Sequence, residues 1–264
     1  MDLYKLKGVK RYVVKVGTSS LTNENSRLDV GKMANLVSDL MNLKEQGRKP
    51  IIVSSGAIGA GMGKLNMTKR PKSVPQLQAA AAIGQGILMQ TYEYFFDNYN
   101  QIMAQILLTK DDFTNSDRRQ NLRNTLETLL EWDVIPIINE NDTVATEEIK
   151  VGDNDTLATY LAEVVGASLL IILTDVDGLF TSPPEESGST LVRIVEEVTP
   201  EVESWASNSG KGFGGMYTKV QAAKKLSEGG ITTVIANARE PEVLRKVFEG
   251  TTGTIFKPRG IAND

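Results

Sequence analysis

Short apolar runs rich in β-branched residues alternate with longer helical patterns along most of this chain. The expected strands are Arg11–Val16, Pro50–Ser54, Ile102–Leu108, Val134–Ile138, Leu169–Thr174 and Thr232–Ala236. The expected helices are Asp29–Glu45, Pro75–Tyr94, Ser116–Glu131, Asp153–Val165, Met216–Glu228 and Pro241–Phe248. Because a helix between two strands usually makes them parallel, this alternation predicts an α/β fold, a three-layer α/β/α sandwich with a mainly parallel central sheet.

The length and continuity of the chain favour one domain. The sequence has 264 residues, enough for one large α/β domain, and neither an internal repeat nor a linker divides it. We therefore expect residues 1–264 to form a single domain. In such sheets ligands bind beyond the carboxyl ends of the strands, so the turns that follow the strands are the places to search for a site.

The absence of two residue types limits the possible chemistry. The chain contains no cysteine and no histidine, which excludes thiol nucleophiles, zinc–thiolate sites and histidine general bases. The net charge of −4 argues against a broad basic surface for nucleic acid. The sequence shows neither a signal peptide nor an apolar run long enough to span a membrane, so we expect a cytoplasmic protein.

Three segments combine lysine or glycine with a following helical pattern, which suits a bound anion. Lys15 stands near the end of the first expected strand and precedes the small residues Gly17–Ser20. Ser54–Gly63 contains four glycines, and Gly210–Lys219 passes through further glycines into an expected helix. Backbone N–H groups of such turns can bind phosphate, and lysine adds positive charge. The alternative for the first segment is a partly exposed strand lysine before an ordinary turn, and the alternative for the other two is a flexible surface loop.

Two further segments, Asn139–Thr143 and Gly152–Thr156, are rich in Asp and Asn. Asp153 alone is best explained as a helix N-cap, but that explanation leaves the other polar side chains of both segments without a role. Another turn, Thr174–Phe180, follows the fifth expected strand. These segments together supply lysines, carboxylates and backbone donors but no histidine base. Phosphoryl transfer needs little more, and a carboxylate acceptor is already ionised at pH 7, so the residues indicate a kinase that acts on a carboxylate.

The same segments resemble the amino acid kinase family and, within it, the glutamate kinase branch. The matching blocks follow the family's order through almost the whole chain and are Lys15–Ser19, Ser54–Ile58, Gln78–Gln85, Gln105–Thr109, Asn139–Asp142, Val151–Asp155, Thr174–Leu179 and Gly214–Lys219. The two blocks rich in Asp and Asn mark the glutamate branch.

The resemblance implies ATP-dependent phosphorylation of the L-glutamate side-chain carboxylate to L-glutamyl 5-phosphate, the first step of proline biosynthesis. It assigns catalysis to Lys15 and Lys219, which neutralise the transferring phosphoryl group, and to Asp155, which holds both lysines. It implies that glutamate binds to Ser55, Asp142 and Asn154. The residues it places on the ATP side are Lys15, Thr174, Asp175, Phe213, Gly214, Gly215, Met216, Tyr217, Thr218 and Lys219. Mg²⁺ would arrive as Mg-ATP, with no metal site made of protein side chains.

The resemblance also implies a homo-oligomer, a dimer or tetramer, and feedback inhibition by proline, with no nucleic-acid or membrane partner. The helix Pro75–Tyr94 and the strand–helix region after it are the expected surfaces for self-association. The loop Thr143–Val151 is the expected switch for proline. We expect no C-terminal PUA domain, because the chain stops shortly after Gly253–Phe256. The family usually has tyrosine at the position of Phe180 and a more regular segment than the one that follows it here.

Two alternatives remain open. The first is another carboxylate kinase of the same fold, such as an N-acetylglutamate kinase or an aspartokinase, although the blocks Asn139–Asp142 and Gly152–Asp155 favour free glutamate. The second is a metabolite sensor that has lost catalysis, although Lys15 and Lys219 are both present.

Overall fold

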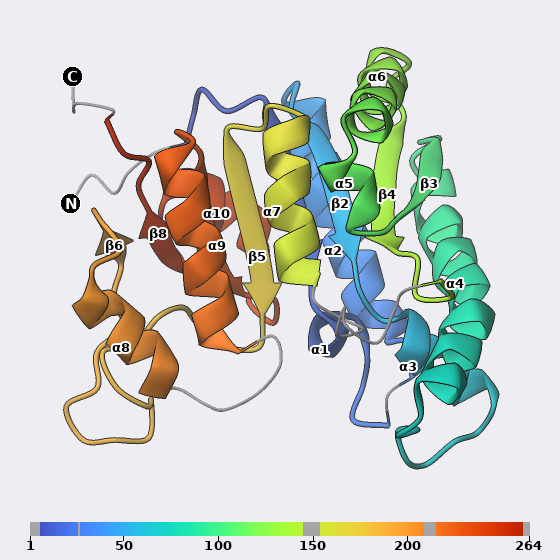
Figure 1. Ribbon diagram of the computed structural model, residues 1–264, viewed down its shortest axis with the longest axis horizontal. Coiled ribbons are helices and arrows are strands. Elements are labelled where there is room, and N and C mark those ends of the chain that lie inside the picture. Colours follow the sequence, from blue (N-terminus) through green and yellow to red (C-terminus); the bar gives the residue numbers. More distant parts are fainter. Residues whose placement is uncertain (1–5, 26, 145–153, 209–214, 261–264) are drawn as a thin grey trace.

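An eight-stranded sheet forms the middle layer of the computed structural model, which describes residues 6–25, 27–144, 154–208 and 215–260 (Figure 1). The strands are β1 (Arg11–Val16), β2 (Lys49–Ser54), β3 (Met103–Leu108), β4 (Ile135–Glu140), β5 (Leu169–Thr174), β6 (Ile194–Val195), β7 (Thr232–Asn237) and β8 (Thr254–Phe256). Their order across the sheet is β3-β4-β2-β1-β5-β7-β8-β6.

The predicted parallel sheet is confirmed over six of these strands, β1 to β5 and β7. Strand β8 pairs antiparallel with β7, and β6 pairs parallel with β8. The sequence did not predict these two strands, because segments of three and two residues are too short to show a period. Strands β1 to β5 and β7 all run in one direction, so their carboxyl ends meet at the lower edge of the sheet in Figure 1.

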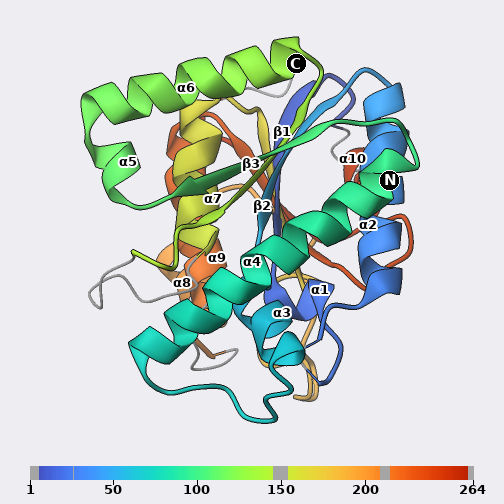
Figure 2. The same cartoon turned by 90° about the vertical axis from the view of Figure 1, so that its right-hand side faces the viewer.

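Helices cover both faces of the sheet, as the alternation predicts, and Figure 2 shows the sheet between the two helical layers. The helices are α1 (Thr18–Leu21), α2 (Val30–Glu45), α3 (Ala57–Lys64), α4 (Val74–Asp97), α5 (Asp111–Thr114), α6 (Ser116–Glu131), α7 (Asn154–Val164), α8 (Pro200–Asn208), α9 (Met216–Glu228) and α10 (Val243–Glu249). Apolar side chains of α2, α3, α4 and α10 pack on one face, and those of α6, α7, α8 and α9 pack on the other.

The sheet has an apolar core on each face, and successive residues of a strand point alternately into one core and the other. In β1, Tyr12 and Val14 pack with α2 and α10, whereas Val13 packs with the helices of the opposite layer. All three side chains are fully buried. This two-residue period sets the direction of the charged residue that follows, because Lys15 must share the face of Val13.

Most of the glycine-rich segment Ser54–Gly63, which the sequence indicates as an anion-binding turn or a flexible loop, is helical. The turn is confined to Ser55 and Gly56, where Gly56 has a left-handed φ of 102°, and helix α3 begins at the next residue. A Cβ at Gly61 would lie 1.9 Å from the carbonyl oxygen of Ala80 in α4, and a Cβ at Gly84 would lie 1.8 Å from that of Ala57. These glycines therefore let two helix backbones touch, which is why a glycine-rich segment is helical here.

Candidate active site

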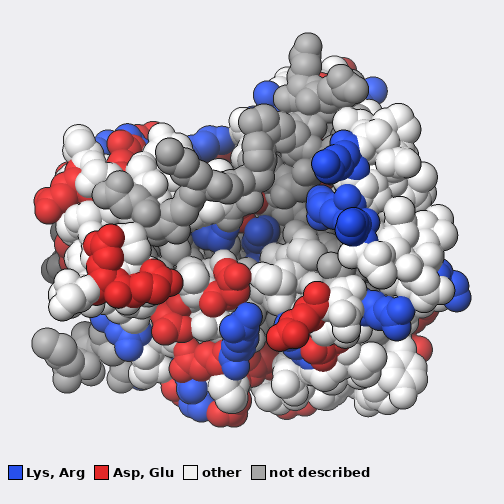
Figure 3. Space-filling view, turned by 90° about the horizontal axis from the view of Figure 1, so that it is seen from below, with Lys and Arg blue, Asp and Glu red and all other residues white. Residues whose placement is uncertain are grey.

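The carboxyl ends of the strands carry most of the predicted site residues. This face has a central hollow, and Lys and Arg side chains gather in and beside it (Figure 3). One pocket of about 350 Å³ lies there, between the end of β4, the start of α7 and the turn before α3. Its lining residues are Thr18, Ser55, Gly56, Ala57, Ile58, Gly59, Arg70, Asn139, Glu140, Asp142 and Asn154. The volume suits a small metabolite.

Two lysines and one aspartate meet at the base of this face. Lys15 Nζ lies 2.7 Å from Asp155 Oδ1, and Lys219 Nζ lies 3.0 Å from Asp155 Oδ2. The three side chains are 9%, 5% and 1% exposed for Lys15, Lys219 and Asp155 respectively. Lys15 lies near the end of β1, and Lys219 and Asp155 lie in the first turns of α9 and α7. Residues far apart in sequence thus form one buried cluster with a net charge of +1.

Burial and pairing act on this cluster in opposite directions. Burial alone would raise the pKa of Asp155, but the ammonium groups of Lys15 and Lys219 hold that pKa below its usual value. Burial lowers the pKa of Lys219, and Asp155 opposes this effect by attraction. Asp155 also accepts a hydrogen bond from the Thr218 hydroxyl at 3.0 Å, and it lies at a helix N-terminus, where negative charge is favoured.

Asn154 organises the neighbouring pocket. Its side-chain amide donates hydrogen bonds of 3.0 Å to the Ser54 carbonyl, 2.9 Å to the Ser55 hydroxyl and 3.0 Å to the Asn139 side-chain oxygen. Asn139 in turn donates to Gln85 Oε1 at 2.8 Å. The side-chain oxygen of Asn154 is buried and, within the described residues, has no hydrogen-bond partner. A buried acceptor without a partner suits a donor supplied by a ligand.

Asp142 and Glu140 are the two acidic side chains among the described residues that line the pocket. Burial raises the pKa of Asp142 to about 7, and repulsion from Glu140 adds to this effect, whereas Arg70 opposes it. Arg70 is the one cationic side chain among the described lining residues. The sequence analysis did not single it out, although the basic run Lys69-Arg70-Pro71-Lys72 was a visible signal. The pocket thus offers both a carboxyl group and a guanidinium to a ligand.

The residues expected on the ATP side lie around the lysine cluster. Thr174 ends β5, and its hydroxyl donates to Asp175 Oδ1 at 3.2 Å. Asp175 acts electrostatically on Lys219, which places it near the cluster. Gly215 caps α9, Met216 is buried and Tyr217 is 47% exposed. Phe213 and Gly214 lie outside the described residues, as do Asp153 and most of the loop Thr143–Val151.

The described residues contain no group of three or more acidic side chains arranged to hold a metal ion. None of the helices in the described part of the chain is long and apolar enough to cross a bilayer.

Comparison with known proteins agrees, over most of the chain, with the family resemblance seen in the sequence. Residues 10–237 match the model of the amino acid kinase family. The chain is 52% identical over 252 residues to the glutamate 5-kinase of Caldanaerobacter subterraneus subsp. tengcongensis, covering 94% of this chain and 68% of that protein. It is 47% identical over 259 residues to the glutamate 5-kinase of Clostridium acetobutylicum, covering 96% and 97% of the two chains. Its fold matches carbamate kinase from Giardia lamblia bound to AMP-PNP, with a TM-score of 0.68 and 14% identity over 95% of this chain and 99% of the other.

Proposed function

Since this chain belongs to the amino acid kinase family and, within it, to the glutamate 5-kinases, we propose that it transfers the γ-phosphoryl group of ATP to the side-chain carboxylate of L-glutamate. The product is L-glutamyl 5-phosphate, which commits glutamate to proline biosynthesis. One observation carries the assignment of the residues: two buried ammonium groups share one carboxylate, beside a pocket lined by Ser55, Asp142 and Asn154.

The transfer needs no base. One oxygen of the substrate carboxylate attacks the γ-phosphorus, and the bond from that phosphorus to the β–γ bridging oxygen breaks. ADP leaves with the electron pair, and no proton moves, because the acceptor is already ionised. Lys15 and Lys219 stabilise the charge that the phosphoryl oxygens carry during transfer, and Asp155 orients both ammonium groups. Because no residue has to accept a proton, the proposed reaction does not need a histidine.

The pocket can recognise the amino-acid end of glutamate by charge. The carboxylate of Asp142 and the free oxygen of Asn154 accept hydrogen bonds from the α-ammonium group. Arg70 pairs with the α-carboxylate. These contacts direct the side-chain carboxylate away from them, toward the lysine cluster. The α-ammonium would also lower the raised pKa of Asp142, so glutamate binding is expected to favour the ionised form of that residue.

The ATP side fits a polyphosphate rather than a protein-bound metal. Lys15 and Lys219 supply positive charge, and the turn after β1 supplies backbone N–H groups. Mg²⁺ enters with the nucleotide, held by phosphate oxygens and water.

Trapping the acyl phosphate tests this function. Enzyme, Mg-ATP and L-glutamate are incubated with hydroxylamine, which converts an acyl phosphate to a hydroxamate. We expect glutamate-dependent formation of γ-glutamyl hydroxamate in step with ADP release. Release of ADP without the hydroxamate would contradict phosphorylation of the carboxylate.

The chain is also proposed to self-associate, through the outer strand β3 and helix α4. Apolar side chains are exposed there, with Tyr94 66%, Ile102 68% and Leu107 38% exposed. We expect a dimer or tetramer by light scattering at micromolar concentration. The variant Ile102→Glu should weaken it, and a wild-type monomer would contradict the proposal.

Proline is proposed as the feedback inhibitor, because it shares the α-carboxylate and cationic nitrogen that this pocket recognises but lacks the carboxylate that accepts phosphate. We expect proline to raise the apparent KM for glutamate and to leave that for ATP nearly unchanged. Competition with ATP instead of glutamate would contradict a shared site.

The domain assignment, one kinase domain over residues 1–264, remains part of the same proposal.

A further inference from the structure

A second cavity, of about 440 Å³, lies on the other face of the sheet from the lysine cluster. Its floor is formed by Val16, the last residue of β1, and Leu173, the residue before the end of β5, which belong to the apolar core on the side of α2. Its walls come from helix α2 and from the segment Ala238–Val243, which leads from β7 into α10. The volume is that of a small-molecule site, and every lining residue belongs to the described part of the chain.

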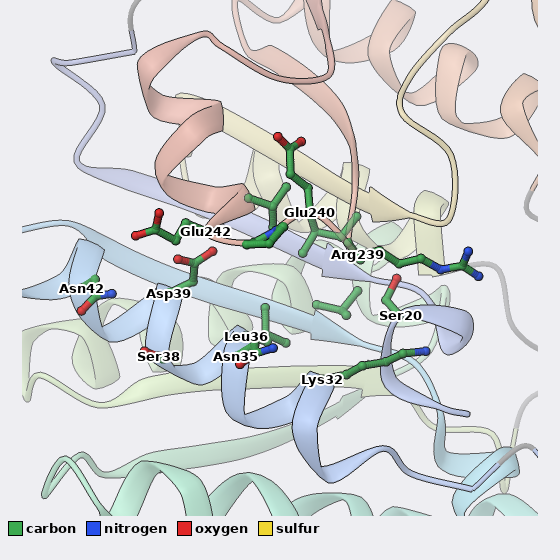
Figure 4. Close-up of a pocket in the computed structure, with 15 residues that line it drawn as sticks. Ser20, Lys32, Asn35, Leu36, Ser38, Asp39, Asn42, Arg239, Glu240 and Glu242 are labelled. Carbon is green, nitrogen blue, oxygen red and sulfur yellow. The ribbon is translucent and has the colours of Figure 1, made fainter. Parts of the chain in front are cut away.

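Charge is separated along this cavity. Figure 4 shows Asp39 and Glu242 at one end and Lys32 and Arg239 at the other, with Leu36 between them. Lys32 and Asp39 are seven residues apart on α2, so the two ends are separated by about 10 Å along the helix. The cavity therefore has an acidic end, a middle with an apolar floor, and a basic end. Glu240 also lines the middle, and it is ion-paired with Lys246 at 2.9 Å.

The acidic end is prepared for a cation. Asp39 is only 7% exposed and accepts a hydrogen bond of 3.0 Å from the backbone N–H of Leu244. Burial is the main cause that raises the pKa of Asp39, and the nearby Glu242 adds to it. Arg245, which pairs with Glu242 at 2.7 Å, and Lys246 oppose this effect. A bound ammonium or guanidinium would relieve this repulsion, because opposite charge favours the ionised form.

The basic end is prepared for an anion. Lys32 is held in place by hydrogen bonds from its ammonium group to the carbonyls of Ser19 (3.0 Å) and Thr22 (2.6 Å). The guanidinium of Arg239 has no ion pair or hydrogen bond within the described residues. The hydroxyl of Ser20, a residue 8% exposed, is buried and likewise has no partner in the described part of the chain.

We propose that this cavity binds a small aliphatic zwitterion of the basic amino acid type, with its distal cation at Asp39 and its carboxylate at Arg239. The methylene groups between the two charges lie on Val16, Leu36 and Leu173. A nucleotide does not fit this pattern, because the acidic end repels phosphate. A purely apolar ligand does not fit either, because it would leave the Ser20 hydroxyl buried without a partner and would bring no positive charge to Asp39.

The cavity is close to the reaction centre although it opens on another face. A Cβ at Gly17 would lie 3.8 Å from Lys15 Nζ and 3.9 Å from Ser20 Oγ. One turn thus separates the catalytic ammonium group from the cavity wall. A ligand in the cavity contacts that turn directly.

Isothermal titration calorimetry with three matched compounds tests the site, with the whole chain saturated with glutamate so that the pocket beside Ser55 is filled. L-lysine carries the distal cation and the carboxylate, together with an α-ammonium group beside the carboxylate. L-norleucine lacks the distal cation, and cadaverine lacks the carboxylate. We expect saturable binding of L-lysine and at least tenfold weaker binding of the other two. Asp39→Asn keeps an acceptor for Leu244, and Arg239→Gln changes an exposed side chain, so both variants should fold normally.

Each variant should weaken L-lysine binding at least tenfold, whereas Lys64→Gln, on α3 outside the lining, should leave it unchanged. The proposal would be overturned by no heat from L-lysine with the wild-type chain, or by equal affinity in wild type and Asp39→Asn. Binding of L-lysine that disappears when glutamate is added would assign it to the glutamate pocket and would also overturn the proposal.

Discussion

Replacement of Asp155 by asparagine should separate the structural and catalytic consequences of the lysine cluster. The wild-type cluster carries two positive charges and one negative charge on side chains that are at most 9% exposed. Asparagine raises the net charge of this largely buried cluster from +1 to +2, and little water is in contact with the ammonium groups to compensate. Removing one partner of a buried ion pair costs about 3–5 kcal/mol, so we expect a loss of that size in the free energy of unfolding at pH 7.

Urea unfolding of Asp155→Asn and of the double variant Asp155→Asn/Lys219→Met measures this loss. The double variant has one buried positive charge fewer, so it should recover part of the stability. The pKa of Asp155 is depressed in the folded chain, so its contribution is present above the unfolded value of 3.8 and disappears as pH falls below it. The difference between wild type and Asp155→Asn should therefore shrink in acid.

The exposed pair Lys224–Glu203 provides a matched control, because its charges remain in contact with water. Glu203→Gln should change stability very little. In enzyme assays, Asp155→Asn should lower kcat more than it raises the KM for glutamate, because its role is to orient the lysines. The reasoning is refuted if Asp155→Asn unfolds at the same urea concentration as Glu203→Gln.

Lys219→Met should lower kcat by about 100- to 1,000-fold in an ADP-release assay, which is the usual cost of removing one donor to a transition-state charge. The Lys15–Asp155 pair should keep the fold intact. A near-normal kcat in the folded variant would contradict the role of Lys219. The pKa of Asp142 is raised from 3.8 to about 7, so its contribution to stability is present below pH 4 and lost as pH rises through 7. Without ligand, wild type should therefore lose up to about 4 kcal/mol relative to Asp142→Asn between pH 4 and 8, and a constant difference in urea unfolding would refute the raised pKa. Gly84→Ala should destabilise the chain by about 3 kcal/mol or more, because its Cβ would meet a carbonyl oxygen of α3, whereas Gly86→Ala in the same helix meets no atom within 4 Å and should be neutral or stabilising by thermal unfolding.

Local patterns predicted the regular elements well where the pattern was long and buried. Strands β1 and β5 have the predicted bounds, since they are apolar runs in the middle of the sheet that end at polar turns. Helix α2 begins one residue later than predicted, because Asp29 accepts a hydrogen bond from Lys32 as the N-cap. Helix α3 was missed because its glycines disfavour a helix locally, and only the contact with α4 explains them.

The sequence pattern alone predicted the site less well than it predicted the helices and strands. Residue chemistry indicated a kinase without a base, but nothing in the spacing of Lys15, Asp155 and Lys219 shows that they meet, since that depends on the order of strands in the sheet. Arg70 was missed because it lies between α3 and α4, in a segment with no strand or helix of its own. The separated charges of the second cavity come from α2 and the segment before α10, and only the folded chain brings them together.

The most direct test of the central claim is the substrate specificity of the purified chain, measured as kcat/KM from ADP release with L-glutamate, N-acetyl-L-glutamate and L-aspartate under identical Mg-ATP. N-acetylglutamate has no α-ammonium to pair with Asp142 and the free oxygen of Asn154, and aspartate is one methylene too short to reach the lysine cluster from that anchor. The account predicts a kcat/KM for glutamate at least 100-fold above that for either of the others. An equal or higher value for N-acetylglutamate or aspartate, or no glutamate-dependent ADP release from the folded protein, would contradict it.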